Sequence, residues 1–418
     1  MSRSSDSPAL PSLVSVSKYL PFEGIRHAGG QYALQHYRAL RDVFGIRIIA
    51  PSTRLNRDAA ETAPDLDYQL LQSRSPLSKD TLKPLADLQS VVAGSSAHPW
   101  FRHALKRDAD ARTSLAAADI IEYQWSEMSS LSRVVRRLAP EAKTVVIAHD
   151  VISQRWARAA GQATNPLRRL AFSAAARASR RRERRSFGDV DAVITFSEKD
   201  AILVRELASS AVPVVVHPGF PVPPEHPQAS PTTSRTVLFT GAMNRPDNDE
   251  AARWFLAAVW PRVIEAVPDA RFRIAGAHPS SALHAAASGS IGVEVTGAVD
   301  SFDAVYASAD VCVVPLRNGA GVKFKTIEAM LWGIPTVATE VGAEGIEAAN
   351  MLHAVVDDAE GFADAVISAL HGDGDRTAAA ARTWAVSVYG LEAFQDRLRS
   401  VYTGILGPQP ERGVSRSR

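Results

Sequence analysis

Residues 311–330 read VCVVPLRNGAGVKFKTIEAM. The opening apolar run, residues 311–314, has the length of a strand that is buried on both faces. Gly319 and Gly321 interrupt this pattern, and a helical segment follows that ends near Gly333. A buried strand, a glycine-containing loop and a helix in this order are typical of a sheet with parallel strands.

The same alternation of short apolar runs and helical segments extends over most of the chain. In the first half, the predicted strands are 13–16, 45–50, 119–123, 144–148, 192–195 and 214–216. In the second half, they are 236–240, 271–275, 293–295, 311–314 and 336–338. Residues 54–90 have weak periodicity and yield no assignment. The predicted fold class is therefore α/β, with two Rossmann-like, doubly wound domains.

A proline-rich segment divides the two sets of strands. Residues 218–224 contain four prolines, which neither a central strand nor a helix tolerates. Polar stretches without periodicity flank the two ends of the chain. We expect a disordered N-terminus at 1–11, an N-terminal domain at 12–217, a linker at 218–234, a C-terminal domain at 235–388, a helix at 389–406 that packs back on the N-terminal domain, and a disordered tail at 407–418.

The composition excludes several classes of protein. Of 418 residues, 46% are hydrophobic and 22% are charged, as in soluble globular proteins. The net charge of +2 provides no overall attraction for nucleic acid. The single cysteine, Cys312, excludes an intrachain disulfide and favours a reducing compartment such as the cytoplasm. No apolar run has the length of a transmembrane helix or of a signal peptide.

The motifs of several cofactor-dependent enzymes are also missing from the sequence. No strand is followed by Gly-x-Gly-x-x-Gly, and no Gly-x-x-x-x-Gly-Lys-Ser/Thr loop occurs, so a nicotinamide dehydrogenase and a nucleoside-triphosphatase are disfavoured. No Cys, His and carboxylate residues have the spacing of metal ligands. We therefore expect neither a metal nor another cofactor.

Two loops after predicted strands of the second half carry residues suited to bind phosphate. The loop containing Gly241, Asn244 and Arg245 precedes a helix expected from about 248 to 266, whose start resembles a capping box formed by Asp247 and Glu250. An ordinary strand-to-helix turn with a solvated arginine explains this loop equally well.

The second loop is more specific. Lys323 and Lys325 stand beside the backbone amides of a helix start, where a diphosphate would find positive potential. Glu328 follows one turn into the helix and has the chemistry to accept hydrogen bonds from ribose hydroxyls. The alternative is a solvated helix start with unspecialised charges.

This string resembles the donor-site signature of the retaining, glycogen-synthase-like (group one) glycosyltransferases. The matching residues are Gly321, Lys323, Lys325, the Ile-Glu-Ala-Met run at 327–330 and Gly-Ile-Pro-Thr-Val-Ala-Thr at 333–339. The resemblance is strong from about 236 to 386 and weaker before it. It implies the GT-B fold, in which two Rossmann-like domains face a central cleft, and sugar transfer from a nucleotide-diphosphate sugar that serves as co-substrate.

The resemblance also implies roles for individual residues of the C-terminal domain. Lys323 would bind the donor diphosphate and take part in catalysis, and Glu328 would bind the ribose. Gly276 and Val299 match the loops beside the base. Two departures from the family pattern are the alanine at 320, where many members have a second glutamate, and the replacement of an expected Arg and Lys by Asn244 and Arg245.

In the N-terminal domain, two segments resemble parts of the family's active site. Gly29 and Gly30 resemble a glycine-rich loop near the donor phosphates and the acceptor, although a plain Gly-Gly turn is an equal alternative. His149 and Asp150 follow the strand at 144–148, where the family often places a His or an acidic residue close to the transferring sugar. The alternative for His149 is a loop histidine that caps a helix.

The segment 165–187 contains eight arginines and one acidic residue, Glu183, with apolar residues at helical spacing. Such a helix can lie on an anionic lipid surface, which suggests a location in the cytoplasm at the inner face of a membrane. The alternative is a solvated face of a connecting helix. Nucleic-acid binding is not expected, because no aromatic residues or base-reading motif accompany the arginines.

The function predicted from the resemblance is retaining transfer of a sugar, as in hexosyltransferases, to a sugar, lipid-linked, polysaccharide or other glycoconjugate acceptor. Two alternatives remain open. One is a nucleotide-sugar 2-epimerase on the same fold, which would turn over the donor without an acceptor. The other is a non-catalytic relative that binds the donor or associates with a membrane.

Overall fold

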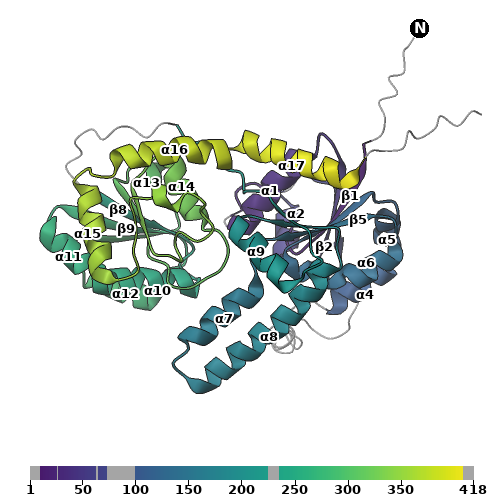
Figure 1. Ribbon diagram of the computed structural model, residues 1–418, viewed down its shortest axis with the longest axis horizontal. Coiled ribbons are helices and arrows are strands. Elements are labelled where there is room, and N and C mark those ends of the chain that lie inside the picture. The colour runs from purple at the N-terminus through teal and green to yellow at the C-terminus, as the bar shows by residue number, and fades with distance from the viewer. Residues whose placement is uncertain (1–9, 26, 63–64, 73–98, 225–234, 408–418) are drawn as a thin grey trace, which may run out of the picture. The chain divides into compact units, whose positions relative to one another are not determined.

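The structure is a computed structural model that describes residues 10–25, 27–62, 65–72, 99–224 and 235–407 (Figure 1). The chain forms two compact units. Unit 1 comprises the chain up to residue 196, residues 200–216 and the segment from residue 394 onward, and unit 2 comprises residues 197–199 and 217–393. The expected disorder at both ends and most of the expected linker lie outside the described residues.

Unit 1 is built on a sheet of seven parallel strands in the order β3-β2-β1-β4-β5-β6-β7. The central strands β1 and β4 are almost entirely buried, which explains their continuous apolar runs. The strand bounds are β1 Ser12–Ser17, β2 Gly45–Pro51, β3 Tyr68–Leu71, β4 Ile120–Gln124, β5 Lys143–Ala148, β6 Ala192–Thr195 and β7 Pro213–Val215.

Helices pack on this sheet, and the last helix of the chain joins them. The helix bounds are α1 Ala28–Leu40, α2 Arg54–Ala60, α4 Pro99–Arg107, α5 Ala109–Ala116, a 3₁₀ helix Ser126–Leu131, α6 Ser132–Leu138, α7 Ile152–Gln162, α8 Pro166–Gly188, α9 Glu198–Leu207 and α17 Leu391–Leu406. On α17, Phe394, Leu398 and Tyr402 are fully buried. Arg399 of α17 donates a hydrogen bond from Nε to the carbonyl of Ala39, at 2.7 Å.

Unit 2 contains a second parallel sheet, of six strands in the order β10-β9-β8-β11-β12-β13. The strand bounds are β8 Arg235–Thr240, β9 Ala270–Ala275, β10 Val293–Gly297, β11 Val311–Val314, β12 Thr336–Ala338 and β13 Ala354–Val355. The apolar side chains of β8, β9 and β11 form the centre of the main core of this unit. Cys312 lies inside β11 as a buried, small side chain.

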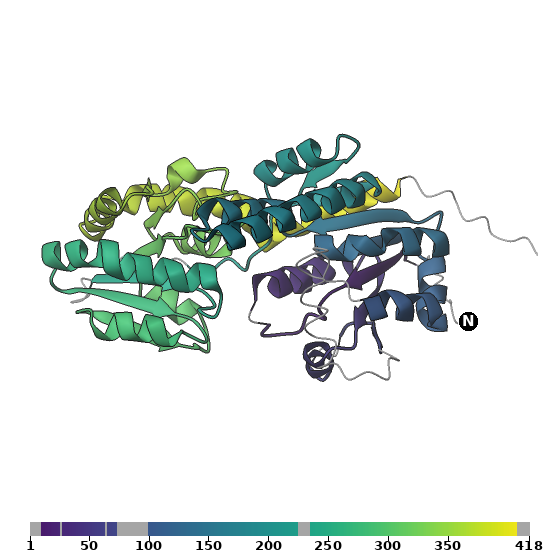
Figure 2. The ribbon, with the colours of Figure 1, turned by 90° about the horizontal axis from the view of Figure 1, so that it is seen from below.

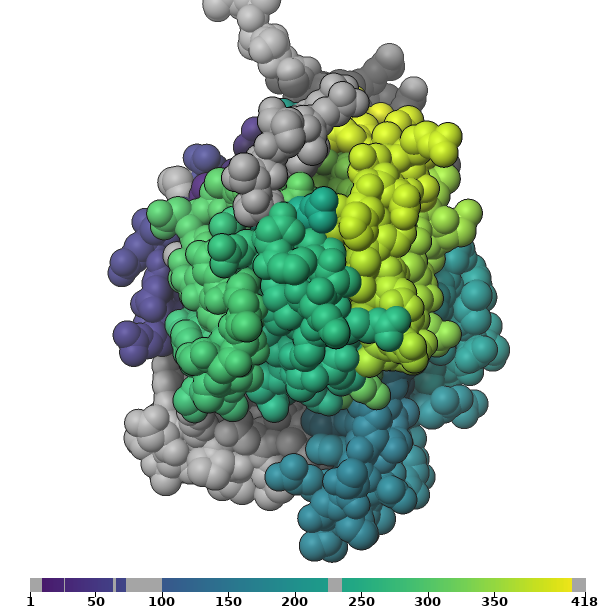
Figure 3. Space-filling model, turned by 90° about the vertical axis from the view of Figure 1, so that its left-hand side faces the viewer, coloured from purple at the N-terminus to yellow at the C-terminus, as the bar shows by residue number. Residues whose placement is uncertain are grey.

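The helices of unit 2 pack on its sheet. Figure 3 shows one side of this unit, coloured green to yellow. The bounds are α10 Pro246–Trp254, a π-helical turn Phe255–Val259, α11 Trp260–Ala266, α12 Ser281–Ser288, α13 Asp303–Ala307, α14 Phe324–Trp332, a 3₁₀ turn Ala349–Met351, α15 Ala359–Leu370 and α16 Asp375–Tyr389. Helix α14 ends at Gly333, whose left-handed φ of 68° suits a glycine.

The predicted capping box at Asp247 and Glu250 is wrong. Helix α10 begins at Pro246, and Arg245 is its N-cap residue with no side-chain cap. Proline is favoured at the first helical position, because its φ is already helical and its missing N–H has no helical partner to lose. The carbonyl of Arg245 accepts the amides of Asn248 and Asp249 at 3.0 and 3.1 Å, so the helix starts two residues earlier than predicted.

The predicted α/β class with two doubly wound, Rossmann-like sheets is confirmed. Two short strands were not predicted. Strand β3 lies within the stretch of weak periodicity, and β13 has only two residues. Neither is long enough to give a periodic signal of its own.

Candidate active site

In unit 2, the candidate residues gather where the strand order reverses. Strands β8 and β11 are neighbours in the sheet, but the chain proceeds from β8 to β9 on one side and from β11 to β12 on the other. The loops after these two strands therefore diverge at their carboxyl ends, which is where open α/β sheets bind ligands. Gly241 follows β8, and Gly321 and Lys323 follow β11.

Gly241 and Gly276 allow the loops after β8 and β9 to approach each other closely. Their φ angles are 152° and 150°, a region that favours glycine. A Cβ on Gly276 would lie 1.7 Å from the carbonyl oxygen of Gly241. A Cβ on Gly241 would lie 2.8 Å from both Asn248 Nδ2 and Lys325 Nζ. Both glycines are therefore required by the geometry of the site.

Lys323 is the N-cap residue of α14 and is 8% exposed. Its Nζ donates to the carbonyl of Gly321 at 2.6 Å and lies 3.3 Å from Oε2 of Glu344. Gly321 has a φ of 74°, which lets the loop turn back over the ammonium group. The loop thus holds a positive charge beside the free amides at the start of a helix.

Lys325 lies two residues further along, in the first turn of the same helix. Its Nζ donates to Asn248 Oδ1 at 2.8 Å and lies 4.3 Å from the centre of the Phe239 ring. Burial, followed by repulsion from Arg245 and Lys323, lowers the pKa of Lys325 to about 7 despite the nearby carboxylates. Near pH 7 part of the population is therefore a neutral amine, which is poised to gain a proton when an anion binds beside it.

Glu328 accepts a hydrogen bond from the hydroxyl of Tyr306 at 3.2 Å. That hydroxyl is also 3.0 Å from Thr240 Oγ1, so the carboxyl group is linked to the end of β8. Burial raises the pKa of Glu328 to about 7, although the Tyr306 hydrogen bond and the charge of Lys325 oppose the shift.

Tyr306, Thr240 and Asn248 are site residues that the sequence analysis missed. Tyr306 lies on α13, Thr240 ends β8, and Asn248 lies in the first turn of α10. Asn248 also donates from Nδ2 to the carbonyl of Ala242 at 2.8 Å, which fixes the amide that meets Lys325. None of these positions belongs to a motif with characteristic spacing, so only the structure brings them together.

The remaining donor-site candidates of unit 2 are more peripheral. Asn244 is exposed, and the side chain of Arg245 is 63% exposed with its Nη2 3.9 Å from Asp247. Val299 packs against the apolar cluster that contains Tyr306 and Trp332, so its side chain serves the core. Base recognition at Val299 by its backbone stays a prediction.

In unit 1, Gly29 and Gly30 lie in the first turn of α1. His27 caps this helix by accepting the amide of Gly30 on Nδ1 at 3.0 Å. A Cβ on Gly30 would lie 2.2 Å from Ile25 Cδ1, so packing requires this glycine. A Cβ on Gly29 would lie 3.1 Å from Trp125 Nε1 and 3.3 Å from His149 Nδ1. Gly29 thus keeps open the space over these two rings.

His149 directly follows β5. Its ring stacks on Trp125 with the centroids 4.6 Å apart, and its Nε2 lies 3.2 Å from Gln124 Oε1. Burial, followed by repulsion from His36, His27 and Lys18, lowers the pKa of His149 well below its ordinary value. The imidazole is therefore neutral near pH 7 and has one donor and one acceptor nitrogen.

The structure excludes the alternative that His149 caps a helix. The N-cap residue of α7 is Val151, and the first amides of α7 are bound by Glu183 of α8. Asp150 lies 3.7 Å from Arg155 and is 27% exposed. His149 and Asp150 are adjacent in sequence, but the histidine is enclosed by aromatic rings and the aspartate is paired with an arginine.

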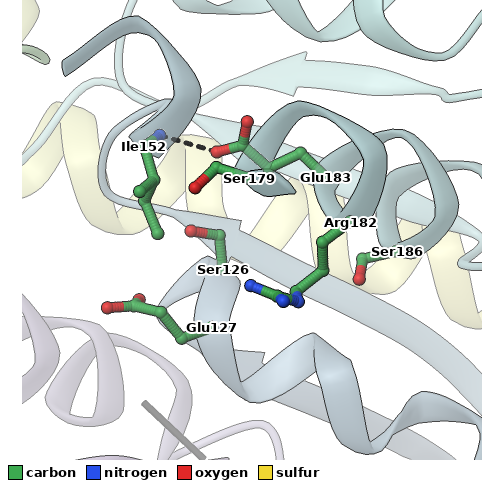
Figure 4. Close-up of a pocket in the computed structure, with 7 residues that line it drawn as sticks. All are labelled: Ser126, Glu127, Ile152, Ser179, Arg182, Glu183 and Ser186. Carbon is green, nitrogen blue, oxygen red and sulfur yellow. Dashed lines mark hydrogen bonds between the residues drawn. The ribbon is translucent and has the colours of Figure 1, made fainter. Parts of the chain in front are cut away.

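A small cavity lies where α8 meets the 3₁₀ helix of unit 1 (Figure 4). It is lined by polar side chains that include Ser126, Ser179, Arg182 and Glu183, and its volume is about 10 Å³. In the described residues, Ser126 Oγ, Ser179 Oγ and Arg182 Nη1 have no hydrogen-bond partner. The volume fits about one water molecule, which is far too little for a sugar nucleotide.

Comparison with known families adds to this geometry. Residues 234–372 match the family described as Glycosyl transferases group 1. The matched segment contains all the candidate residues of unit 2, from Gly241 to Glu328. The candidates of unit 1, Gly29, Gly30, His149 and Asp150, lie outside it.

A relative from Klebsiella pneumoniae matches part of this chain. An uncharacterised 44.6 kDa protein in the cps region of Klebsiella pneumoniae is 34% identical over 116 residues, which span 26% of this chain and 30% of that protein. This chain thus matches about a third of the relative's length.

The solved structures of similar fold include glycosyltransferases. Sucrose-phosphate synthase from Thermosynechococcus elongatus has a TM-score of 0.70 at 16% identity, covering 94% of this chain and 98% of that one. Anabaena HepE in complex with UDP and glucose has a TM-score of 0.66 at 11% identity, covering 94% and 100%. WaaG, a glycosyltransferase involved in lipopolysaccharide biosynthesis, has a TM-score of 0.62 at 14% identity, covering 94% and 100%. At these identities the likeness concerns the fold, which is that of GT-B glycosyltransferases.

Proposed function

We propose that this chain is a glycosyltransferase that moves a sugar from a nucleotide-diphosphate donor to an acceptor with retention of the anomeric configuration. The observation that carries the proposal is the grouping of Lys323, Lys325 and Glu328 at the strand-order reversal of a glycosyl transferases group 1 domain. Ligands bind at this position in open α/β sheets, and the helix start adds free amides to the two ammonium groups.

In the proposed reaction, unit 2 holds the donor. Lys323, Arg245 and the amides at the start of α14 bind the diphosphate, and Glu328 accepts hydrogen bonds from the ribose. When the glycosidic bond to the donor breaks, negative charge develops on the departing nucleoside diphosphate, and the cationic groups stabilise it. Lys323 and Lys325 are already held in place by hydrogen bonds, so they need little reorganisation during the reaction.

Unit 1 is proposed to supply His149 and the Gly29-Gly30 turn to the transferring sugar and the acceptor. HepE is described in complex with UDP and with UDP-glucose, and WaaG with lipopolysaccharide biosynthesis. The Klebsiella relative is a protein of the cps region. These descriptions favour a nucleotide-sugar donor and a lipid-linked, polysaccharide or other glycoconjugate acceptor for this chain.

The test is a thermal-shift screen of the full chain against a panel of nucleotide-sugars, followed by product analysis of the best binder with and without acceptors. We expect stabilisation by one donor class and release of nucleoside diphosphate only when an acceptor is present. Conversion of the donor to an epimer without acceptor would instead show a 2-epimerase. Binding without any turnover would show a non-catalytic relative, and a lack of binding to every donor would overturn the proposal.

A membrane surface is proposed as a second partner, and α8 carries the argument. Helices α7 and α8 lie side by side as a pair in unit 1 (Figures 1 and 2). The buried residues of α8 are Ala175, Ser179, Glu183, Ser186 and Phe187. The only acidic residue of α8, Glu183, is therefore on the inner side, where it binds the first amides of α7.

The outer side of α8 is apolar near its start and basic toward its end. Leu167 and Leu170 are 78% and 64% exposed. The exposed arginines that continue this side at helical spacing are Arg177, Arg181, Arg184 and Arg185. Basic residues near an anionic bilayer contribute about 1 kcal/mol each, and exposed leucines can enter its interface. In the described part of the chain, no helix is long and apolar enough to cross a membrane.

Co-sedimentation with vesicles tests this partner. We expect binding to phosphatidylcholine vesicles that contain phosphatidylglycerol, and none to phosphatidylcholine alone. The double variant Leu167→Glu, Leu170→Glu should lose binding, whereas Arg54→Glu, at an exposed arginine of α2, should keep it. Equal binding of all three proteins would contradict a role for α8, and binding by none would leave α8 as a solvated helix.

A further inference from the structure

The most unusual group of buried polar residues in the described chain lies behind His149. Glu122, in the middle of β4, is fully buried, and so are His36 of α1 and Tyr402 of α17. Glu122 Oε2 accepts hydrogen bonds from His36 Nε2, at 2.9 Å, and from the hydroxyl of Tyr402. Its other oxygen, Oε1, accepts from Gln124 Nε2 at 3.2 Å. Gln124 is also fully buried and is the residue that contacts His149.

These contacts allow only one orientation of the Gln124 amide between Glu122 and His149. A carboxylate accepts hydrogen bonds and donates none, so Gln124 must turn its NH₂ group toward Glu122. The amide oxygen of Gln124 then faces His149 Nε2, at 3.2 Å. An oxygen at this position requires a proton on Nε2, and the second ring nitrogen of a neutral imidazole, Nδ1, then has a free lone pair.

Burial and hydrogen bonding keep both ends of this chain of contacts in a fixed charge state. Burial alone would raise the pKa of Glu122, but the interaction with His36 and the hydrogen bonds from His36, Ser15 and Tyr402 outweigh it and lower the pKa. His149 faces His36, His27 and Lys18, and burial and these groups keep the imidazole neutral near pH 7.

Aromatic rings hold the His149 ring in place, and a glycine lies beside its Nδ1. Tyr32 and Phe196 meet the ring edge-on at 5.2 and 5.1 Å, and Trp125 stacks on its face. Trp125 has a φ of 72°, which costs a bulky residue of the order of 1 kcal/mol or more and persists only where other contacts compensate. Gly29, beside Nδ1, has no side chain to cover it.

We infer that Glu122 is a positioning residue that acts through Gln124 to keep His149 in the Nε2–H tautomer, so that Nδ1 accepts a hydrogen bond from a hydroxyl of the sugar in transfer. The role of Glu122 rests on the proposed function only for its last step, the contact with sugar. The tautomer itself is a property of the free protein. The two can therefore be tested separately.

The substitution Glu122→Gln provides a sharp test. The oxygen of the introduced amide would still accept from His36 and Tyr402, so its NH₂ group would point at Gln124. Gln124 would then have to turn its oxygen toward this new donor and its NH₂ group toward His149. His149 Nε2 would become an acceptor, and the proton would move to Nδ1. The variant keeps the size of the side chain but reverses the tautomer.

The measurement is the ¹⁵N chemical shift of the His149 ring in the full chain, assigned with a His149→Gln variant. We expect protonated Nε2 in the natural protein and protonated Nδ1 in Glu122→Gln. With the donor and acceptor that the thermal-shift screen and product analysis identify, we expect kcat/KM for sugar transfer to fall about tenfold in Glu122→Gln, the loss of about one hydrogen bond. A protonated Nδ1 in the natural protein, or an unchanged tautomer in Glu122→Gln, would overturn the inference whatever the activity.

Two further variants keep the test decisive if Glu122→Gln does not fold. Gln124→Met removes the connection while leaving Glu122 in place, and it should give a mixture of both tautomers. Glu183→Gln, at the other buried glutamate described in unit 1, is the matched control that should leave the tautomer unchanged. A change of tautomer in Glu183→Gln would show a general effect of neutralising a buried glutamate and contradict the inference. The predicted tautomers together with no sugar transfer by the natural protein would uphold the connection and reject the proposed function.

Discussion

Both units place a buried carboxyl group at the strand-order reversal of a parallel sheet, but the two groups differ in charge. Burial raises the pKa of Glu328 in unit 2 to about 7, and only Tyr306 is seen to donate a side-chain hydrogen bond to it in the described residues. Glu122 in unit 1 is at least as deeply buried, yet the interaction with His36 and the hydrogen bonds from His36, Ser15 and Tyr402 lower its pKa. Burial acts on both groups, so the surrounding interactions, first of all that with His36, decide the direction of the pKa shift.

The neighbouring bases differ in the same way. Lys325 in unit 2 has a pKa of about 7 and a ligand anion would charge it, whereas His149 in unit 1 is held neutral near pH 7. Unit 2 thus has a site whose charge responds to an anionic ligand, and unit 1 has a site with fixed hydrogen-bond directions. The same sheet edge supports either chemistry, depending on the residues around it.

Removal of the positive charge from unit 2 is expected to have the largest effect. In Lys323→Ala, the developing charge on the nucleoside diphosphate loses a preorganised donor, so kcat/KM for transfer should fall about 100- to 1,000-fold. Steady-state kinetics, together with a melting curve that shows a folded protein, measure this effect. The matched control is Lys106→Ala, at an exposed lysine of α4. Undiminished transfer in Lys323→Ala would show that the positive charge of Lys323 does not stabilise the departing nucleoside diphosphate.

The two buried glutamates should respond in opposite ways when they are neutralised. The pKa of Glu328 is about 7 in the folded protein against 4.5 otherwise, so its contribution to stability is present below pH 4.5 and is lost as the pH rises through 7. Glu328→Gln should therefore raise Tm at pH 8, while weakening donor binding about 30-fold through lost hydrogen bonds to a charged group.

Glu122 provides the other half of this pair. Because its pKa is lowered in the folded protein, it contributes stability above the ordinary carboxyl pKa, and Glu122→Gln should lower Tm at pH 8. Differential scanning calorimetry of both variants between pH 5 and pH 8, a range set by the pKa shifts, compares them directly. Changes in Tm of the same sign at pH 8 would show that burial alone determines the pKa shifts of both carboxyl groups.

A smaller effect is expected on the pH dependence of donor binding. Below pH 7, Lys325 is already charged, but above it the lysine must take up a proton when the diphosphate binds. The affinity should therefore fall as the pH rises above 7, by at most about tenfold for each pH unit. Isothermal titration calorimetry with UDP-glucose measures this, because its diphosphate diester does not titrate in this range. The slope should flatten in Lys325→Arg, and an equal slope in that variant would assign the proton to another group.

The smallest effect is expected at Gly29. In Gly29→Ala the new Cβ meets Trp125 Nε1 at 3.1 Å and His149 Nδ1 at 3.3 Å, so these rings must shift by a few tenths of an ångström. We expect a loss of a few-fold in kcat/KM from steady-state kinetics. Gly161→Ala in α7, where a Cβ meets no atom within 4 Å, is the control and should be neutral or slightly stabilising. Equal kinetics of both variants would show that the space beside Nδ1 is not used.

The strands and the donor loop could be predicted from the sequence because their signals are local. The apolar runs of β4, β5 and β11 and the spacing from Gly321 to Glu328 each lie within a short window. The contacts that determine the chemistry do not lie within a short window of sequence. Glu122 lies 86 residues after His36 and 280 residues before Tyr402, and the contacts among them depend on how the helices pack.

One local signal for this cluster was available but was not used. Glu122 lies inside the apolar run of β4. A charged side chain within a strand that is buried on both faces is expected only where hydrogen-bonding or oppositely charged groups surround it. Its identity as a buried carboxyl could thus have been inferred, although its partners could not. Likewise, the proline at 246 could have indicated the true start of α10.

The position of Tyr402 in α17 has a consequence for biosynthesis. Translation proceeds from the N-terminus, so the sheet of unit 1 leaves the ribosome long before residue 402 is made. Until then, Glu122 lacks the hydrogen bond from Tyr402, and Tyr32 lacks its contact with Phe394. Unit 1 therefore begins to be synthesised first, but its interior cannot be completed until α17 has been made.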